Sequence, residues 1–228
     1  MNNQIRRYIP NSLTFISLGC GTVSIVLSSQ EYIFQAGLLI LVSLIFDVLD
    51  GFSARKLNAA TQFGLQLDSL SDMVSFGVAP LVLILHHFGT RDINGFWLFP
   101  LIILPIWAGA FRLARFNLQS PKQSSEHDSL GLTITQSGFI LSLTVLSDLS
   151  LADYSLPLGI YIILLLILSY LMISKIRFPF SPLYIPSRKF FYIYCIIGVG
   201  LIPFGSIFAS ILIISLGNLA ISTSRNYL

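Results

Sequence analysis

The chain has 228 residues, of which 54% are hydrophobic and only 10% are charged, and its mean hydropathy is +0.81. A water-soluble domain of this length would need a surface with about a quarter of its residues charged, so the composition excludes that class. The formal net charge of only +3 gives no indication of a nucleic-acid partner.

Apolar runs long enough to cross a bilayer, which takes about 20 residues, recur along the whole chain. They predict an all-α polytopic membrane protein with about eight transmembrane helices, in which residues 1–228 form a single integral-membrane domain. Core spans cover about 9–174, and an extra C-terminal helical hairpin covers about 189–223. Its turn is "IPFGS" at 202–206, and without this turn the last hydrophobic block is one kinked helix. The predicted spans are 9–29, 32–57, 61–88, 95–118, 131–149, 154–174, 189–203 and 205–223.

Basic residues are distributed unevenly between these spans. With the N-terminus placed inside, only Arg91 of the thirteen lysines and arginines falls on the outer side, as the positive-inside rule requires. This asymmetry predicts an inner or cytoplasmic membrane protein with both termini on the cytoplasmic side, where basic loop residues contact anionic lipid. On the outer side we expect Asp148 in a loop, and His86 and His87 at the membrane interface.

The stretch "DVLDGFSARKLNAATQFGLQLDSLSD", residues 47–72, carries four aspartates into the inner ends of the second and third spans. The pairs Asp47–Asp50 and Asp68–Asp72 have i,i+3 and i,i+4 spacing, so the members of each pair are neighbours on a helix. Because consecutive spans are antiparallel, the two acidic faces are expected to face each other. The small residues on the same faces, which leave room for close packing or a ligand, are Gly51, Ala54 and Gly64.

Four carboxylates this close in an apolar setting need neutralisation, since each costs about 2.5–3.5 kcal/mol at the centre of a membrane helix. A bound divalent cation achieves this better than protonation, and oxygen-only ligands favour Mg²⁺ or Mn²⁺, or Ca²⁺, over zinc. Four carboxylates suffice for two ions. Arg55, one turn beyond Asp50, adds a cation suited to a phosphate oxygen. The alternative is a buried ion-pair cluster that only stabilises packing; we expect a metal site that handles a phosphorylated substrate.

These residues resemble the signature of the CDP-alcohol phosphotransferase family, D-x-x-D-G-x-x-A-R, then about eight residues, then G-x-x-x-D-x-x-x-D. All eight fixed positions match in order and spacing, and the helical layout fits the family across most of the chain. The resemblance implies this family's helical-bundle fold, a homodimer, and displacement of CMP from a CDP-linked substrate by a hydroxyl group. The matching residues are Asp47, Asp50, Gly51, Ala54, Arg55, Gly64, Asp68 and Asp72.

The resemblance also implies roles for individual residues. Asp47, Asp50 and Asp68 would be metal ligands, and Asp72 would be both a metal ligand and the general base that takes the proton of the acceptor hydroxyl. Asn11 belongs to a further family pattern, "PN..T" on the first span, although an asparagine that caps a helix start explains it equally well. The residues expected at the CDP-linked lipid are Asn11, Thr14, Asp50, Gly51, Ala54, Arg55 and Gly64.

Three further stretches resemble the phosphatidylserine synthase subfamily: "LDSLSDMVSFGVAP" at 67–80, "FRLARFN" at 111–117 and "LMISKIRFP" at 171–179. This resemblance implies CDP-diacylglycerol as the donor and L-serine as the acceptor. The segment "GLTITQSG" at 131–138 departs from the subfamily, because Thr133 stands where such enzymes often have proline. Another acceptor, such as an inositol phosphate or glycerol 3-phosphate, therefore stays open.

Arg112 and Arg115 lie near the inner end of the fourth span and can offer forked donors to a carboxylate or a phosphate. The alternative is that both anchor the helix by snorkelling to the interface.

Two other functions stay open on the residues alone. An intramembrane prenyltransferase also binds a diphosphate through aspartates and Mg²⁺, although its acidic clusters usually lie on distant helices. A divalent-cation transporter would be expected to carry polar residues along a path to the outer side, whereas the second and third spans become apolar in that direction.

Overall fold

Long helices make up most of the protein, and the computed structural model describes residues 3–90, 99–118, 128–150, 155–179 and 207–225. Two three-residue strands, β1 (Asp128–Leu130) and β2 (Arg177–Pro179), pair antiparallel, with Ser129 opposite Phe178. Apart from this short pairing, the expectation of an all-helical protein is confirmed in the described residues. In chain order the helices are α1 (Asn3–Ser29), α2 (Ile33–Lys56), α3 (Gln62–Asp72), the π-helical turn η1 (Met73–Val78), α4 (Ala79–Gly89), α5 (Phe99–Asn117), α6 (Ile134–Ser150), α7 (Leu158–Ile173) and α9 (Ile207–Arg225).

Four helical segments are long and apolar enough to cross a bilayer, and they coincide with the first four predicted spans. The expectation of a membrane protein is therefore confirmed. Shorter helices follow: α6 has 17 residues, and α7 and the apolar part of α9 are shorter still. The predicted span 189–203 and the turn at 202–206 lie outside the described residues, so the count of about eight spans and the single-domain boundaries stay predictions. The four segments are Tyr8–Ser29, Ile33–Lys56, Gln62–Gly89 and Phe99–Asn117.

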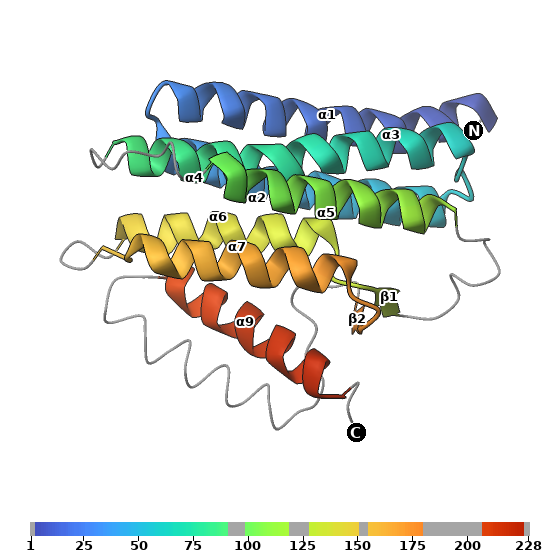
Figure 1. The fold of residues 1–228 in the computed structure, drawn as a ribbon. Helices are drawn as coiled ribbons and strands as arrows, with labels where there is room; N and C mark the ends of the chain where they lie inside the picture. The colour runs from blue at the N-terminus through green and yellow to red at the C-terminus, as the bar shows by residue number, and fades with distance from the viewer. Residues whose placement is uncertain (1–2, 91–98, 119–127, 151–154, 180–206, 226–228) are drawn as a thin grey trace.

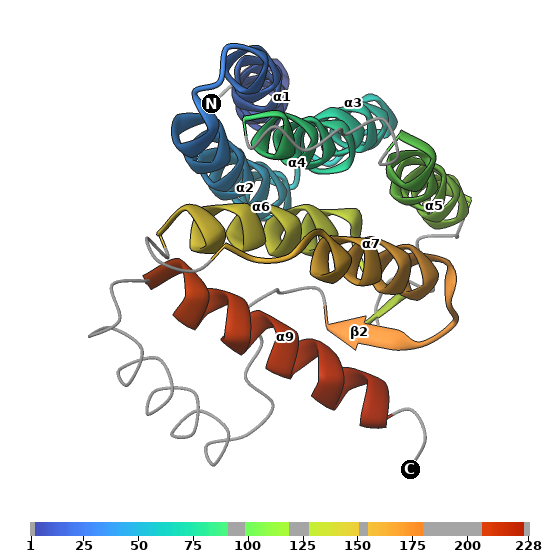
Figure 2. The ribbon, with the colours of Figure 1, turned by 60° about the vertical axis from the view of Figure 1, so that its left-hand side comes forward.

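The helices pack in layers around α6 (Figure 1). In Figure 2, α1, α2, the continuous α3–η1–α4 helix and α5 arch over α6 and α7, and α9 lies on the opposite side of α6. Every residue of α6 from Gln136 to Asp148 is buried, since α2, η1, α4 and α9 surround it. Hydroxyl groups in this helix bond back to its own carbonyls, as Thr144 does to the Ile140 carbonyl at 2.8 Å.

Helix α1 turns small polar residues inward and large apolar residues outward. Its buried positions recur every three or four residues, the spacing of one helix face. This inversion of the pattern of a soluble helix suits a helix that faces lipid on one side and approaches its neighbours closely on the other. From Thr14 onward the buried residues are Thr14, Ser17, Gly21, Ser24 and Ser28, and exposed ones include Phe15, Ile16, Val23 and Val26.

Hydroxyl groups bridge the closely packed helices. The Ser17 hydroxyl of α1 and the Ser43 hydroxyl of α2 lie 2.8 Å apart, and Ser43 also donates to the Ser17 carbonyl at 2.9 Å. From the third helix, Ser71 donates to the Thr14 carbonyl at 3.3 Å and Ser75 donates to the Ser17 carbonyl at 3.2 Å. These bonds hold α1, α2 and α3–η1 at one axial position relative to each other.

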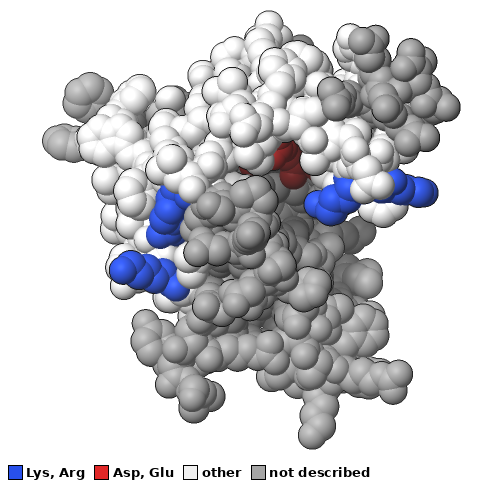
Figure 3. Space-filling view, turned by 90° about the vertical axis from the view of Figure 1, so that its right-hand side faces the viewer, with Lys and Arg blue, Asp and Glu red and all other residues white. Residues whose placement is uncertain are grey.

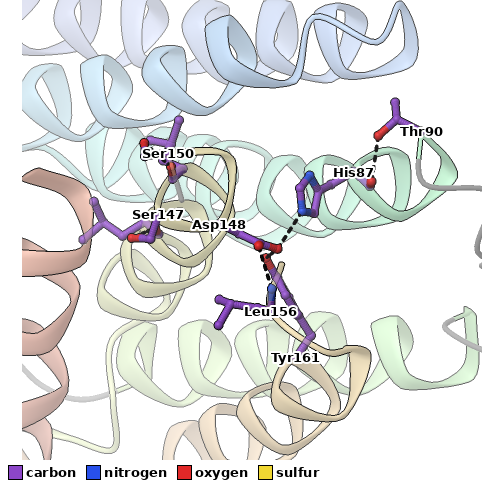
Figure 4. Close-up of polar contacts among 9 residues, drawn as sticks. His87, Thr90, Ser147, Asp148, Ser150, Leu156 and Tyr161 are labelled. Atoms are coloured by element: carbon purple, nitrogen blue, oxygen red, sulfur yellow. Dashed lines mark hydrogen bonds and ion pairs between the residues drawn. The ribbon is translucent and has the colours of Figure 1, made fainter. Parts of the chain in front are cut away.

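A second polar cluster ties α4, α6 and α7 at the far end of the bundle (Figure 4). His87 Nε2 lies 2.9 Å from Asp148 Oδ2, which also accepts a hydrogen bond from the Tyr161 hydroxyl at 2.9 Å. The Leu156 backbone N–H donates to the other carboxylate oxygen at 2.8 Å. The expectations that Asp148 lies in an outer loop and His87 at the membrane interface are wrong, because α6 continues to Ser150 and both side chains are buried in the helix contact.

Replacement of Gly21 by alanine should force α1 away from η1. A Cβ atom at Gly21 would lie 2.7 Å from the Ser75 Cα, which is backbone and cannot rotate away. Gly21→Ala is therefore expected to lower the thermal unfolding midpoint of the protein in detergent. Gly19→Ala is the matched control in the same helix, because no atom lies within 4 Å of its added Cβ; it should be neutral or stabilise by about 0.5–1 kcal/mol. Equal midpoints for the two variants would contradict the close packing.

Removal of the Asp148 carboxylate should destabilise the far end of the bundle. Asp148→Ala leaves His87, Tyr161 and the Leu156 N–H without their shared partner, which costs about 3–5 kcal/mol for a buried pair. Tyr161→Phe removes the hydrogen bond to this carboxylate and should cost about 1.5–3 kcal/mol, the range for a hydrogen bond to a charged group. The free energy of unfolding of each variant can be measured in detergent. If Tyr161→Phe lowered it as much as Asp148→Ala, the central role of the Asp148 carboxylate would be contradicted.

Candidate active site

The four aspartates gather at the end of the bundle where α2 ends and α3 begins. Oxygens of Asp47, Asp50 and Asp68 lie within 4.8 Å of one another, so the predicted meeting of two acidic faces is confirmed. Asp72 lies beside Asp47 but outside this closely spaced group. Figure 3 looks onto this end of the molecule and shows acidic atoms in a hollow with basic side chains on both sides.

A tight connection between α2 and α3 makes the meeting possible. The Ala59 N–H donates back to the Ala54 carbonyl at 2.9 Å, and Asn58 adopts a left-handed conformation with φ of 48°, which asparagine tolerates well. The Thr61 hydroxyl then caps α3 by accepting from the Gly64 N–H at 3.0 Å. The chain thus reverses within a few residues, and the second acidic face returns directly beside the first.

Two cavities meet at the aspartates. The larger, of about 370 Å³, is lined by all four aspartates and extends to Arg112 on α5 and to Thr133 and Thr135 at the start of α6. The smaller, of about 210 Å³, lies between α1, the end of α2 and the start of α3. Asp72 lines only the larger one. Residues that line both cavities are Asp50, Gly51, Arg55 and Asp68.

The smaller cavity brings together the residues predicted to contact the CDP-linked lipid. Thr14 donates to Asp50 Oδ2 at 2.6 Å and to the Pro10 carbonyl at 3.1 Å, which fixes the carboxylate orientation. Asn11 lies inside α1, which begins at Asn3, so the explanation that it caps a helix start is wrong. The predicted lining residues found here are Asn11, Thr14, Asp50, Gly51, Ala54, Arg55 and Gly64.

Arg112 and Arg115 have different surroundings in the structure. Arg112 is 5% exposed and lines the larger cavity beside the aspartates. Arg115 instead donates to the Leu130 carbonyl at 2.6 Å and, at the C-terminus of α7, to the Ile173 carbonyl at 3.2 Å. Arg115 thus holds the segment before α6 against a helix end that favours a cation. A substrate-binding role for either arginine stays a prediction.

Three threonines that line the two cavities were not predicted as site residues: Thr61, Thr133 and Thr135. Thr133 was noted only as a departure from the subfamily pattern. A local signal exists for it, because its hydroxyl accepts from the Gln136 N–H at 3.1 Å and so marks the start of α6. No local signal places the start of α6 beside the aspartates, since this proximity comes from tertiary packing of α6 against η1.

The donor set of the larger cavity fits a hard divalent cation. Its aspartates offer only carboxylate oxygens, and Asp72 Oδ1 is buried without a hydrogen-bond partner among the described residues. Four carboxylates face two guanidinium groups, those of Arg55 and Arg112, so the lining is net negative. Such a lining favours a bound cation over a self-sufficient ion-pair cluster.

The fold and the site together define a membrane protein with an acidic cavity suited to divalent cations, at the end of a helical bundle. The profile of the CDP-alcohol phosphatidyltransferase family matches residues 7–178, and the chain belongs to this divalent-metal-dependent family.

Curated relatives from bacteria and archaea cover most of the chain. A CDP-diacylglycerol–serine O-phosphatidyltransferase of Helicobacter pylori is 34% identical over 178 residues, which are 75% of this chain and 71% of the relative. One from Methanocaldococcus jannaschii is 32% identical over 191 residues, 82% of this chain and 80% of the relative. An archaetidylserine synthase of Methanothermobacter thermautotrophicus is 34% identical over 173 residues, 75% and 69% of the two chains.

Loss of one carboxylate of the group should weaken cation binding. Asp68→Asn is expected to reduce Mn²⁺ affinity by at least about tenfold, a loss seen even for residues that only support metal ligands. Electron paramagnetic resonance of Mn²⁺ titrated into purified protein measures this. Glu31→Gln, which removes a carboxylate from the α1–α2 turn, is the control for overall charge. Equal affinities for the two variants would contradict a cation site at Asp68.

Proposed function

We propose that this protein transfers the phosphatidyl group of CDP-diacylglycerol to the hydroxyl of L-serine, with phosphatidylserine and CMP as products. The observation that carries the proposal is the meeting of two cavities at Asp50 and Asp68, with Asp47 and Asp72 on the wall of the larger cavity. Transfer between two substrates needs a binding site for each of them beside one reacting centre, and the two cavities can supply these sites. The names of the relatives support serine as the acceptor.

The smaller cavity is the proposed site of the CDP part of the donor. Asn11 and Thr14 supply polar groups there, and Gly64 leaves room, because a Cβ at that position would lie 3.2 Å from Asn11 Oδ1. Arg55 lines both cavities, so its guanidinium can bond diphosphate oxygens where donor and acceptor meet.

Asp47, Asp50, Asp68 and Asp72 are the proposed holders of the divalent cations, Mg²⁺ or Mn²⁺, and two ions are expected. When bound, these cations offset the negative charge of the diphosphate and of the departing CMP. The chain itself contributes orientation. Thr14 fixes Asp50 by its hydrogen bond, and the serine bridges between α1, α2 and α3 hold the two acidic faces opposite each other.

Asp72 is the proposed general base. It lines only the larger cavity, and Oδ1 makes no hydrogen bond to the described residues, so it can accept the proton of the serine hydroxyl. The hydroxyl oxygen forms a bond to the lipid-linked phosphorus of the diphosphate. The bond from that phosphorus to the bridging oxygen breaks, and CMP leaves with the electron pair.

Apolar side chains on the other walls of the larger cavity suit the lipid part of the donor. Leu44 and Val48 of α2 line it, as do Leu113 and Phe116 of α5, and Val48 is also exposed on the outside of the bundle. The glycerol backbone can lie between these helices while the acyl chains extend into the bilayer.

Topology and assembly belong to the same proposal. The active site and both termini lie on the cytoplasmic side, and residues 1–228 form one catalytic domain with core spans over about 9–174 and a C-terminal hairpin over about 189–223. The homodimer rests on the family resemblance alone. Family membership also favours phosphoryl transfer over the prenyltransferase and the cation transporter.

The test is CMP release by the purified protein with CDP-diacylglycerol and Mg²⁺ or Mn²⁺, run separately with L-serine, myo-inositol, glycerol 3-phosphate and no acceptor. We expect release that depends on the cation and on L-serine. Release with a different acceptor would overturn the serine assignment and keep the chemistry, and no release with any acceptor would overturn both.

Asp72→Asn should then lose at least about a hundredfold in turnover, since general bases contribute about 10²–10⁴-fold. Binding of CDP-diacylglycerol, measured by calorimetry in detergent, should persist because Asp72 does not line the smaller cavity. Unchanged turnover would contradict its role as base.

A further inference from the structure

A π-helical turn follows Asp72 directly in the continuous helix that runs from α3 through η1 to α4. The turn spans Met73–Val78, and the Ala79 N–H closes it by donating to the Val74 carbonyl, five residues back instead of four. Such turns are rare in helices, and they occur frequently at functional sites. Because a regular α-helix is the ordinary conformation of such a segment, contacts with neighbouring helices have to hold the wider turn in place.

Helices α1, α5 and α6 all pack against η1, and two of them reach its backbone at a glycine (Figure 2). A Cβ atom at Gly21 of α1 would lie 2.7 Å from the Ser75 Cα. A Cβ atom at Gly138 of α6 would lie 2.6 Å from the Phe76 carbonyl oxygen. Two adjacent residues of η1 are thus held by close backbone contact, one by α1 and the next by α6.

A third contact with η1 is made by one side chain. Ile134, the first residue of α6, is 1% exposed, and its Cδ1 atom lies between Gly77 of η1 and Gly109 of α5. A Cβ atom at Gly77 would lie 3.1 Å from this Cδ1, and a Cβ atom at Gly109 would lie 2.6 Å from it. The Met73 sulfur borders the same space, 3.3 Å from a Cβ at Gly77. Ile134 therefore fills the space between η1 and α5 that the two glycines leave.

The direction of the Asp72 carboxylate depends on where η1 lies. Asp72 is only 7% exposed, and its Oδ1 atom is buried without a hydrogen-bond partner among the described residues. Since no hydrogen bond from these residues orients that oxygen, the position of the adjoining backbone has to do so. Met73 connects the two features, because it follows Asp72 in the chain and borders the space that Ile134 fills. A shift of Ile134 would therefore reach Asp72 through a single residue.

We propose that Ile134 is a positioning residue, which holds η1 in place on the side of α5 and so keeps the Asp72 carboxylate directed into the larger cavity. This inference rests on the proposed function, in which Asp72 is the general base. Ile134, Gly77 and Gly109 line neither cavity, so their effect on a substrate is indirect. Disturbance of this packing should therefore lower kcat and leave KM for CDP-diacylglycerol unchanged.

The test adds a methyl group on either side of Ile134 and then removes the methyl group that it meets. Gly109→Ala should lower kcat for serine-dependent CMP release by about 10- to 100-fold, since misplacement by about 1 Å can cost about 10²-fold. Gly77→Ala should lower kcat less, because its added Cβ meets Ile134 at 3.1 Å instead of 2.6 Å. Ile134→Val deletes Cδ1, so it should restore most of the lost kcat in both alanine variants, the coupling expected of residues in contact.

The matched control is Gly37→Ala, at the opposite end of α2 from the aspartates. Its Cβ would lie 2.8 Å from Leu146 Cδ2, a similar contact with α6 that is remote from Asp72. Both Gly37→Ala and Gly109→Ala should lower the thermal unfolding midpoint in detergent without added cation, and Ile134→Val should raise it again only for Gly109→Ala. At temperatures below its midpoint, Gly37→Ala should keep the wild-type kcat.

Equal losses of kcat in Gly37→Ala and Gly109→Ala, or no recovery with Ile134→Val, would overturn the positioning role and leave the proposed function standing. If Gly109→Ala does not fold, the comparison of Gly77→Ala with and without Ile134→Val decides the question in the same way. If the wild type shows no serine-dependent release, the proposed function fails and the positioning role fails with it.

Discussion

Repulsion among buried carboxylates is the constraint on which the rest of this structure depends. Three carboxylates within 4.8 Å of one another repel by about 3 kcal/mol per pair at an effective dielectric constant near 20. The summed repulsion of three such pairs is comparable to the whole free energy of unfolding of an ordinary domain, about 5–15 kcal/mol. Two guanidinium groups in the same cavity do not balance four aspartates. Bound cations or protonation relieve this repulsion, so the stability of the bundle depends on what neutralises these carboxylates.

Close helix packing is what keeps the carboxylates together despite this repulsion. Lipid gives no hydrophobic drive for helix association, so small residues and interhelical hydrogen bonds have to supply it. The Ser17–Ser43 bridge and the contact of Gly21 with Ser75 do so near the aspartates. At the far end, Asp148 joins three helices through buried polar groups. The helix that carries Asp68 and Asp72 is thus held at the π-helical turn η1, through Ser75, and at its far end, through His87.

Short-range periodicity explains how much of the site could be predicted from the sequence. The spacing of the four aspartates places each pair on one face of its helix. Because only a short turn joins the two helices, these two faces come to lie against each other. Long-range packing explains the failures. Asp148 contacts His87 across 61 residues, and no local pattern reveals that α6 is buried on all sides. In the sequence, Arg115 and Arg112 lie near each other on one predicted helix and could have the same role. In the structure, however, Arg115 donates to a carbonyl at the C-terminus of α7.

The residues that line the site come from two pairs of elements, and the sequence motif covers only one of these pairs. The aspartates and Arg55 come from α2 and α3, and all of these residues belong to the 26-residue motif. The opposite wall comes from α5 and the start of α6, and its position depends on backbone bonds to α7. Thr133 and Thr135 line this wall, which carries none of the four aspartates. The motif therefore indicates the reaction and leaves the acceptor open, because it does not include the residues of the opposite wall.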